Sequence, residues 1–163
     1  MGDLVYFSIG PRRGLRRGTS ALAWYDRGCA LEAHDPAAAL EAYQRALAGR
    51  PDLADAHNNM GRILHDRGDL AAAEGHYRLA LCSDGEVALY WFNLGVVLED
   101  LGRAAEAIRA YEQALARDAT LADAHYNLAR QIEQAARRSG DEIMLFRAVR
   151  HLKQYRELSR ALG

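Results

Sequence analysis

The sequence predicts an all-α fold, an array of about four stacked helical hairpins, and three observations support this. Tyr43, Tyr77 and Tyr111 stand 34 residues apart, and each opens a five-residue phrase with Ala fourth and Leu fifth. Half of the residues are apolar, alanine is abundant, and Pro, Phe and Trp are few, which favours close-packed helices. One such unit is too small to bury its apolar face alone, so neighbouring units must stack.

The first helix of each unit is predicted from a second recurring phrase. Ala54-Asp-Ala-His57 returns as Ala122-Asp-Ala-His125, with Ala88-Leu-Tyr-Trp91 between them. Each phrase is followed by Asn, a hydrophobic residue and a small residue: Asn59-Met60-Gly61, Asn93-Leu94-Gly95 and Asn127-Leu128-Ala129. The small residues let two helix backbones approach, and the large ones fill the gaps between them.

Turn and cap signals predict where each first helix ends and the second begins. Gly68 and Gly102 follow the first helices of two units, and glycine adopts the left-handed conformation there without steric cost. Asp69 is placed to cap the next helix. In the first unit Asp35 takes this role, with Pro36 at the first helical position.

These residues resemble the tetratricopeptide repeat, a helical hairpin of 34 residues. The third unit, 88–121, matches its motif at Trp91, Leu94, Gly95, Leu98, Ala107, Tyr111 and Ala114. The second unit, 54–87, matches at Met60, Gly61, Leu64, Ala73, Tyr77 and Ala80, and the first, about 20–53, at Trp24, Gly28, Leu31, Tyr43, Ala46 and Pro51. The resemblance implies a right-handed α–α superhelix whose first helices line a concave groove.

The fourth unit, 122–163, departs from this pattern after His125, Leu128 and Ala129. An insertion near Arg137–Gly140 precedes a predicted long helix from about Glu142 to Ala161. Its apolar residues recur every three to four positions, with charged residues on the other face. We expect a helix that caps the array, as helical arrays require, and the alternative is a docking or dimerisation helix. Residues 20–163 thus form one predicted repeat domain.

Charge is divided unevenly along the chain. Residues 1–18 carry a net charge of +3 and residues 137–163 a net charge of +4, whereas residues 19–136 carry −8. We expect residues 1–19, with Arg12, Arg13, Arg16 and Arg17, to be a basic, flexible segment. This segment is inert, lies as a peptide in an acidic groove, or contacts nucleic acid. Because no aromatic residues lie between the arginines, direct nucleic-acid binding is not expected.

The asparagines that recur in the first helices are the main candidate binding residues. Asn59, Asn93 and Asn127 should form a ladder along the groove, and some members of the family are known for such a row. An amide offers a donor and an acceptor, so the ladder can bind the backbone of an extended peptide whatever its side chains. The alternative is that these asparagines tie neighbouring repeats together.

Further groove residues suggest the chemistry of the ligand. The predicted peptide-binding set also includes Asp55, Arg62, Phe92, Asp123, Tyr126 and Arg130. Acidic side chains outnumber basic ones along this face, and Phe92 and Tyr126 are apolar anchors. We expect an extended partner with basic groups, the alternative being a solvated face with ordinary ion pairs. Some family members grip a C-terminal carboxylate with Lys and Arg, but here only Arg62 and Arg130 are available.

The motifs of the common enzyme and cofactor classes are absent from the sequence. It has no phosphate-binding glycine loop, no His-Glu-x-x-His and no Gly-x-Ser-x-Gly, so neither an enzyme nor a cofactor is expected. Cys29 and Cys82 are expected as free thiols. His57 and His125 fill the slot of an aromatic residue, so packing is expected rather than metal binding. Without an apolar run of about 18 residues or a secretory pattern, we expect a cytoplasmic protein.

The sequence therefore predicts a scaffold or adaptor that binds an extended peptide or a partner's helix in its groove. We expect a protein partner, no membrane, and a monomer or a weak homodimer. The alternative is a regulatory module of a bacterial transcription system. That role would need a DNA-binding partner, because the chain has no helix-turn-helix of its own.

Overall fold

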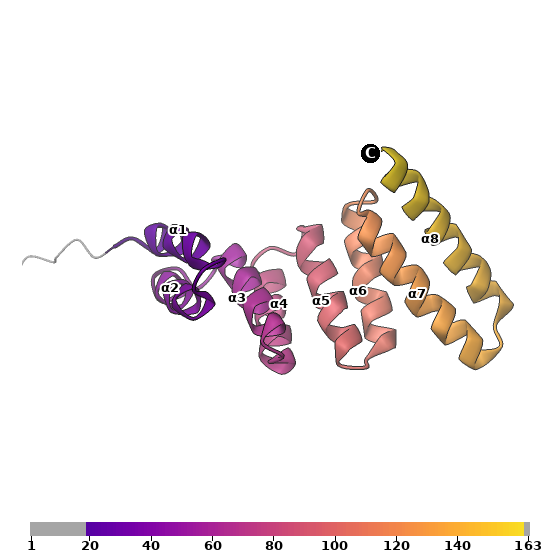
Figure 1. Ribbon diagram of the computed structural model, residues 1–163, viewed down its shortest axis with the longest axis horizontal. Coiled ribbons are helices and arrows are strands. Elements are labelled where there is room, and N and C mark those ends of the chain that lie inside the picture. The colour runs from indigo at the N-terminus through magenta and orange to yellow at the C-terminus, as the bar shows by residue number, and fades with distance from the viewer. Residues whose placement is uncertain (1–18, 162–163) are drawn as a thin grey trace, which may run out of the picture.

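The computed structural model describes residues 19–161, which form eight helices arranged in a row (Figure 1). The helices are α1 (Ala21–Leu31), α2 (Pro36–Gly49), α3 (Ala54–Asp66), α4 (Leu70–Ser83), α5 (Ala88–Asp100), α6 (Ala104–Arg117), α7 (Ala122–Ser139) and α8 (Glu142–Ala161). They pair into four hairpins, and the second helix of each hairpin packs against the first helix of the next. The fold is therefore the predicted all-α, right-handed superhelix of helical hairpins.

A tyrosine packed on a glycine joins the two helices of each of the first three hairpins. Tyr43, Tyr77 and Tyr111 are at most 1% exposed. A Cβ atom added to Gly61 would lie 2.8 Å from the ring of Tyr77, and Gly28 and Gly95 face Tyr43 and Tyr111 in the same way. The 34-residue period of tyrosines therefore reflects a packing contact that only glycine permits.

The core follows the row of helices and has no single centre. One cluster runs from α4 to α8 and includes Leu98, Leu128 and Ile132. A second cluster joins α2 and α3 through Tyr43, Met60 and neighbouring residues. Each hairpin thus completes its core with apolar residues of its neighbours, as in other stacked arrays.

The predicted glycine turns are confirmed. Gly68 and Gly102 have φ angles of +83° and +73°, in the left-handed region. The N–H of Gly68 donates to the carbonyl oxygen of His65 at 2.8 Å, and the N–H of Asp69 donates to that of Leu64 at 2.9 Å. This pair of bonds satisfies the last carbonyl groups of α3.

One predicted cap is confirmed and the other is wrong. Asp35 accepts a hydrogen bond from the N–H of Ala38 at 3.0 Å, and Pro36 begins α2. Asp69 precedes α4, but its side chain makes no capping hydrogen bond. Its backbone has φ −79° and ψ 62°, compared with φ −144° and ψ 81° at Asp35, so the two side chains leave the chain in different directions.

The fourth hairpin is longer than the others, as predicted. The insertion extends α7 to 18 residues, compared with 13 in α3 and α5. The α8 helix spans Glu142–Ala161, and Asp141 accepts hydrogen bonds from the N–H groups of Ile143 and Met144. Apart from Thr19, the predicted basic segment at residues 1–19 lies outside the described residues.

Candidate functional site

The surface formed by α3, α5 and α7 carries all nine predicted binding residues, some of them exposed and some half-buried. We call this surface the inner face and define it by Asp55, Asn59, Arg62, Phe92, Asn93, Asp123, Tyr126, Asn127 and Arg130. Two of its helices, α3 and α5, contact each other directly. The nine residues are spread over three successive first helices.

A hollow of about 480 Å³ lies between α5 and α7 on the inner face. Leu89 and Phe92 form its apolar wall, and Asp123 lies on its rim. Leu89 is 48% exposed, which is high for a large apolar side chain. Tyr155 and Ser159 of α8 border the same hollow. The last helix therefore contributes to this site, a role that the sequence reasoning did not assign to it.

Tyr126 lies at the α8 end of the inner face. Its side chain is 44% exposed, and its ring centre lies 5.2 Å from that of Tyr155. The predicted anchor is thus accessible, and it has an aromatic neighbour from the following helix. Phe92, the other predicted anchor, is half-buried, with its ring centre 5.8 Å from that of Tyr111.

The three asparagines of the predicted ladder bind the preceding hairpin through their side-chain N–H groups. Asn59 Nδ2 donates to the hydroxyl oxygen of Tyr43 at 3.2 Å, and Asn127 Nδ2 donates to that of Tyr111 at 3.4 Å. Asn93 Nδ2 donates to Asn58 Oδ1 at 2.8 Å. The sequence offered the alternative that these asparagines tie neighbouring repeats together. The structure contains such contacts at all three positions.

The bond from Asn127 belongs to a polar cluster that joins the third and fourth hairpins. The hydroxyl of Tyr111 donates to Glu99 Oε2 at 3.1 Å, and Arg130 forms an ion pair with Glu99. Burial raises the pKa of the Tyr111 hydroxyl, and the charge of Glu99 raises it further. The tyrosine therefore stays protonated and remains a donor to the carboxylate.

The same cluster recurs between the first and second hairpins. The hydroxyl of Tyr43 donates to Glu32, and Arg62 forms an ion pair with Glu32. Sequence reasoning did not predict that these glutamates pair with an arginine of the next repeat, although Glu32 and Glu99 each stand four residues after a packing glycine. Because Arg62 and Arg130 are engaged with these carboxylates, neither is an unpaired cation on the inner face.

The junction between the second and third hairpins differs from the other two. Val96 stands on α5 where α3 and α7 carry Arg62 and Arg130, and His65 stands where the neighbouring repeats carry glutamate. His65 Nε2 lies 2.6 Å from Asp100 Oδ2. Burial raises the pKa of Tyr77, the tyrosine of this junction, to about 12. The centre of the inner face thus lacks an arginine and is more apolar than its ends.

Asp55 has a fixed partner, whereas Asp123 lies at the rim of the hollow. The hydroxyl of Tyr90 donates to Asp55 Oδ1, which links α5 to α3. Burial raises the pKa of Tyr90, and the hydrogen bond to Asp55 adds to this effect. Asp123 is exposed beside the hollow between α5 and α7.

Two pairs of histidines pack inside the even-numbered hairpins. His57 Nδ1 lies 3.1 Å from His76 Nδ1, and His125 Nδ1 lies 2.9 Å from His151 Nδ1. Burial lowers the pKa of His57, His76 and His151, so the neutral rings are favoured. Among residues 19–161, no three His, Cys, Asp or Glu side chains are grouped so that they could hold a metal ion.

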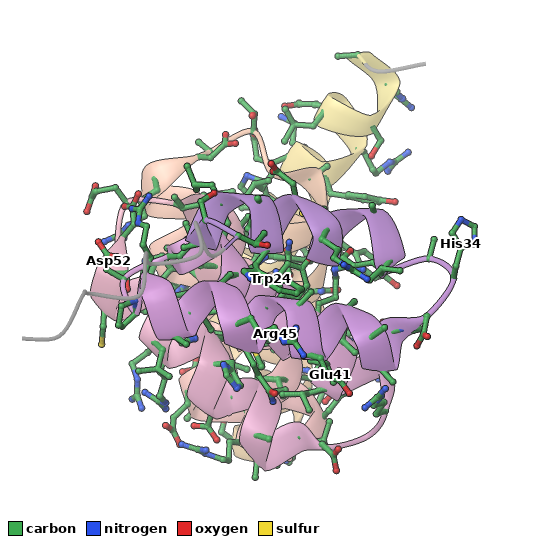
Figure 2. All side chains as sticks on the ribbon, turned by 90° about the vertical axis from the view of Figure 1, so that its left-hand side faces the viewer. Trp24, His34, Glu41, Arg45 and Asp52 are labelled. Carbon is green, nitrogen blue, oxygen red and sulfur yellow. The ribbon has the colours of Figure 1, made fainter. Side chains whose placement is uncertain are left out.

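Tryptophans occupy the matching slot in the odd-numbered hairpins. Trp91 Nε1 donates to the carbonyl oxygen of Gly85 at 2.8 Å, as His57 contacts Pro51 in the preceding repeat. The guanidinium of Arg45 lies 4.5 Å from the centre of the Trp24 ring (Figure 2). The alternation of Trp and His shows that two repeats, rather than one, form the chemical period of the array.

None of the described helices combines the length and the apolar character needed to cross a bilayer.

Comparison with known proteins agrees with this architecture. Models of the tetratricopeptide repeat match residues 25–87 and 88–121. A crystal structure of MamA has a TM-score of 0.77 at 17% identity, covering 88% of this chain and 80% of its own. MamA from Desulfovibrio magneticus has a TM-score of 0.73 at 20% identity, covering 88% and 78%. No curated protein sequence matches the chain.

A structure of pilF from Pseudomonas aeruginosa is also similar. Its TM-score is 0.75 at 20% identity, covering 85% of this chain and 61% of its own. At such identities these likenesses concern the fold alone.

Proposed function

Because the chain belongs to the tetratricopeptide repeat family, whose members generally serve as protein-interaction scaffolds, we propose that its inner face binds an extended segment of a partner protein. The hollow between α5 and α7 carries this proposal. Its apolar wall combines Leu89, which is 48% exposed, with the half-buried Phe92, and Tyr126 provides an exposed aromatic side chain on the same face. Exposed aromatic and apolar side chains in a recess are typical anchors of protein interfaces.

The inter-repeat bonds of the asparagines support peptide binding. The bond from Asn93 to Asn58, and that from Asn127 to Tyr111, each use one amide N–H and fix the plane of the side chain. Within the described chain, Oδ1 of each of these two asparagines accepts no hydrogen bond. A fixed amide with a free oxygen and a second N–H can bind a peptide backbone without losing further rotational freedom.

The charges along the inner face favour a basic segment. Arg62 and Arg130 are neutralised by Glu32 and Glu99, whereas the carboxylates of Asp66 and Asp123 are exposed, as is that of Asp100 beside His65. A ligand with Lys or Arg beside an apolar residue would match both the rim and the wall of the hollow. A free C-terminal carboxylate fits poorly, because both arginines of this face are already paired.

The test uses surface residues, so that the variants keep their fold. A fluorescent peptide selected from a random library against the full chain would be titrated by anisotropy. Leu89→Ser and Asp123→Lys should each weaken binding about tenfold, since each removes one component of the contact. Leu79→Ser is the matched control, because Leu79 is also 48% exposed but lies on α4. Equal affinity for all four proteins would refute the proposal.

A further inference from the structure

The outer edge of α8 exposes a row of large apolar side chains. Ile143, Phe146 and Val149 follow one another at intervals of three residues, with 76%, 75% and 62% of each side chain exposed. The opposite face of α8 packs on α7, with Ala148 buried between them. In Figure 1, α8 is the last helix of the row, and no further helix covers its outer side. Such a row is more apolar than an ordinary surface helix requires.

The register of α8 shows what this surface is shaped to receive. Ala73 and Ala148 each stand three residues before a histidine, His76 and His151, that contacts the matching histidine of the helix before it. Ala148 is therefore the counterpart of Ala73, and by the 34-residue period also of Ala39 and Ala107. One and eight positions after that alanine, α6 places Ile108 and Leu115 against the core that α7 completes. In α2 the same positions are Leu40 and Leu47, which pack with α3 residues. These are the positions at which a second helix receives the next helix of the array.

On α8 the two matching positions, Val149 and Arg156, are exposed, and Leu152 between them is half-buried. Val149 corresponds to Ile108, and Leu152 corresponds to Tyr111. Arg156 corresponds to Leu115. The surface of α8 that matches the helix-receiving side of α6 is therefore apolar at Val149 and cationic at Arg156. A hollow of about 680 Å³ lies here, and Tyr126, Val149, Leu152 and Arg156 are among its lining residues. A recess between helices accommodates side chains of a docked helix better than a flat lipid surface.

The charges on α8 indicate which kind of helix would dock on this surface. Arg150, Lys153, Arg156 and Arg160 follow the same stretch of α8. Arg147 forms an ion pair with Glu112 at 2.7 Å, and Lys153 lies 3.9 Å from Glu157, which also lines the hollow. The described residues supply no carboxylate to Arg150, Arg156 or Arg160 within ion-pair distance, so the basic charge of this stretch is only partly balanced. We infer that the outer face of α8, defined by Phe146, Val149, Leu152, Lys153 and Arg156, binds an acidic amphipathic helix of another protein. The apolar stripe of that helix would cover Phe146 and Val149, and its carboxylates would face the basic side chains.

A second copy of this chain fits this surface less well. Two α8 helices placed together would bring two sets of basic side chains into contact, which is unfavourable. The free side of α1, by its register with α3, presents Ala23, Asp26, Arg27 and Ala30. These residues offer one carboxylate, and the neighbouring Leu22, 50% exposed, is the large apolar side chain that α1 exposes.

The experiment measures binding of a synthetic amphipathic helix, about 18 residues long, with leucine on one face and glutamate flanking it. The full chain would be titrated against the labelled peptide by fluorescence anisotropy. Phe146→Ser combined with Val149→Ser should weaken binding at least about tenfold. Lys153→Glu combined with Arg156→Glu should weaken binding of the glutamate peptide. The same variant should strengthen binding of a matched peptide with lysine flanks. Circular dichroism should show an unchanged helical signal, because all the altered side chains are exposed.

Two further variants separate this surface from others. Leu79→Ser, a matched exposed leucine on α4, should leave binding unchanged, and so should Leu89→Ser on the inner face. The proposal is overturned if the glutamate and lysine peptides bind equally, or if the α8 variants bind like the original chain. It is also overturned if vesicles of anionic phospholipid bind through Phe146 and Val149 while the peptide does not. Concentration-dependent self-association that the same serine variant abolishes, without peptide binding, would assign the surface to a second copy instead.

Discussion

Asn59 donates a hydrogen bond to the hydroxyl oxygen of Tyr43, 3.2 Å away, and so joins α3 to the hairpin before it. Tyr43 is itself fully buried and donates to Glu32. The asparagine that the sequence suggests as a ligand contact therefore also stabilises the stack. A scaffold needs this combination, because a binding surface spread over several hairpins keeps its geometry only if the hairpins are fixed to one another.

Replacing Asn59 by Ala should lower the free energy of unfolding by about 1 kcal/mol, the usual net value of one hydrogen bond in a folded protein. The loss stays modest because Tyr43 retains Glu32 as its acceptor. Urea denaturation followed by circular dichroism measures the change. Gln44→Ala, at an exposed position on α2, is the control and should have little effect. If Asn59→Ala were as stable as the original chain, the link would be negligible.

Two glycine substitutions should have opposite effects on stability. Gly61→Ala places a methyl group 2.8 Å from the ring of Tyr77 and should destabilise the fold by about 1–3 kcal/mol. Gly75→Ala, within α4, meets no heavy atom within 4 Å and should stabilise by about 0.5–1 kcal/mol through helix propensity. Thermal and urea unfolding of both variants test the pair. If Gly61→Ala were as stable as the original chain, the ring of Tyr77 must be able to move to another packed position.

Acidification should destabilise the second hairpin through His57 and His76. Burial lowers the pKa of both rings in the folded chain, and the charge of His57 lowers the pKa of His76 further. The unfolded chain, with an ordinary histidine pKa of about 6.5, then binds more protons than the folded one below that pH. The stabilisation is therefore present above about pH 6.5 and is lost as the pH falls below it.

The measurement for this pair is the free energy of unfolding at several pH values between neutrality and mild acid. His76→Gln removes one of the two depressed groups and should reduce the slope. A steeper fall in that variant than in the original chain would contradict the assignment of the slope to this pair.

The hairpins and turns could be predicted from the sequence because they depend on local spacing. Gly68 and Gly102 mark turns that any chain of this kind must make, and the bounds of α8 follow from its apolar period. Contacts between repeats could not be predicted in this way. The bond between His57 and His76 depends on how two helices face each other, which a 34-residue period does not specify.

Similarly, Glu32 meets Arg62 only because two hairpins stack in one register.

Three expectations from the sequence stay predictions: the cytoplasmic location, the flexibility of residues 1–19 and the alternative role in a transcription system.

The binding role of the inner face is tested most directly by nuclear magnetic resonance. A library-selected peptide with basic residues would be titrated into the isotope-labelled full chain, and the backbone amide shifts followed residue by residue. We expect the largest changes at Phe92, Asn93 and Tyr126, with the outward positions of α4 and α6 unaffected. Changes confined to α4, α6 or α8, with Phe92 and Asn93 silent, would contradict the account.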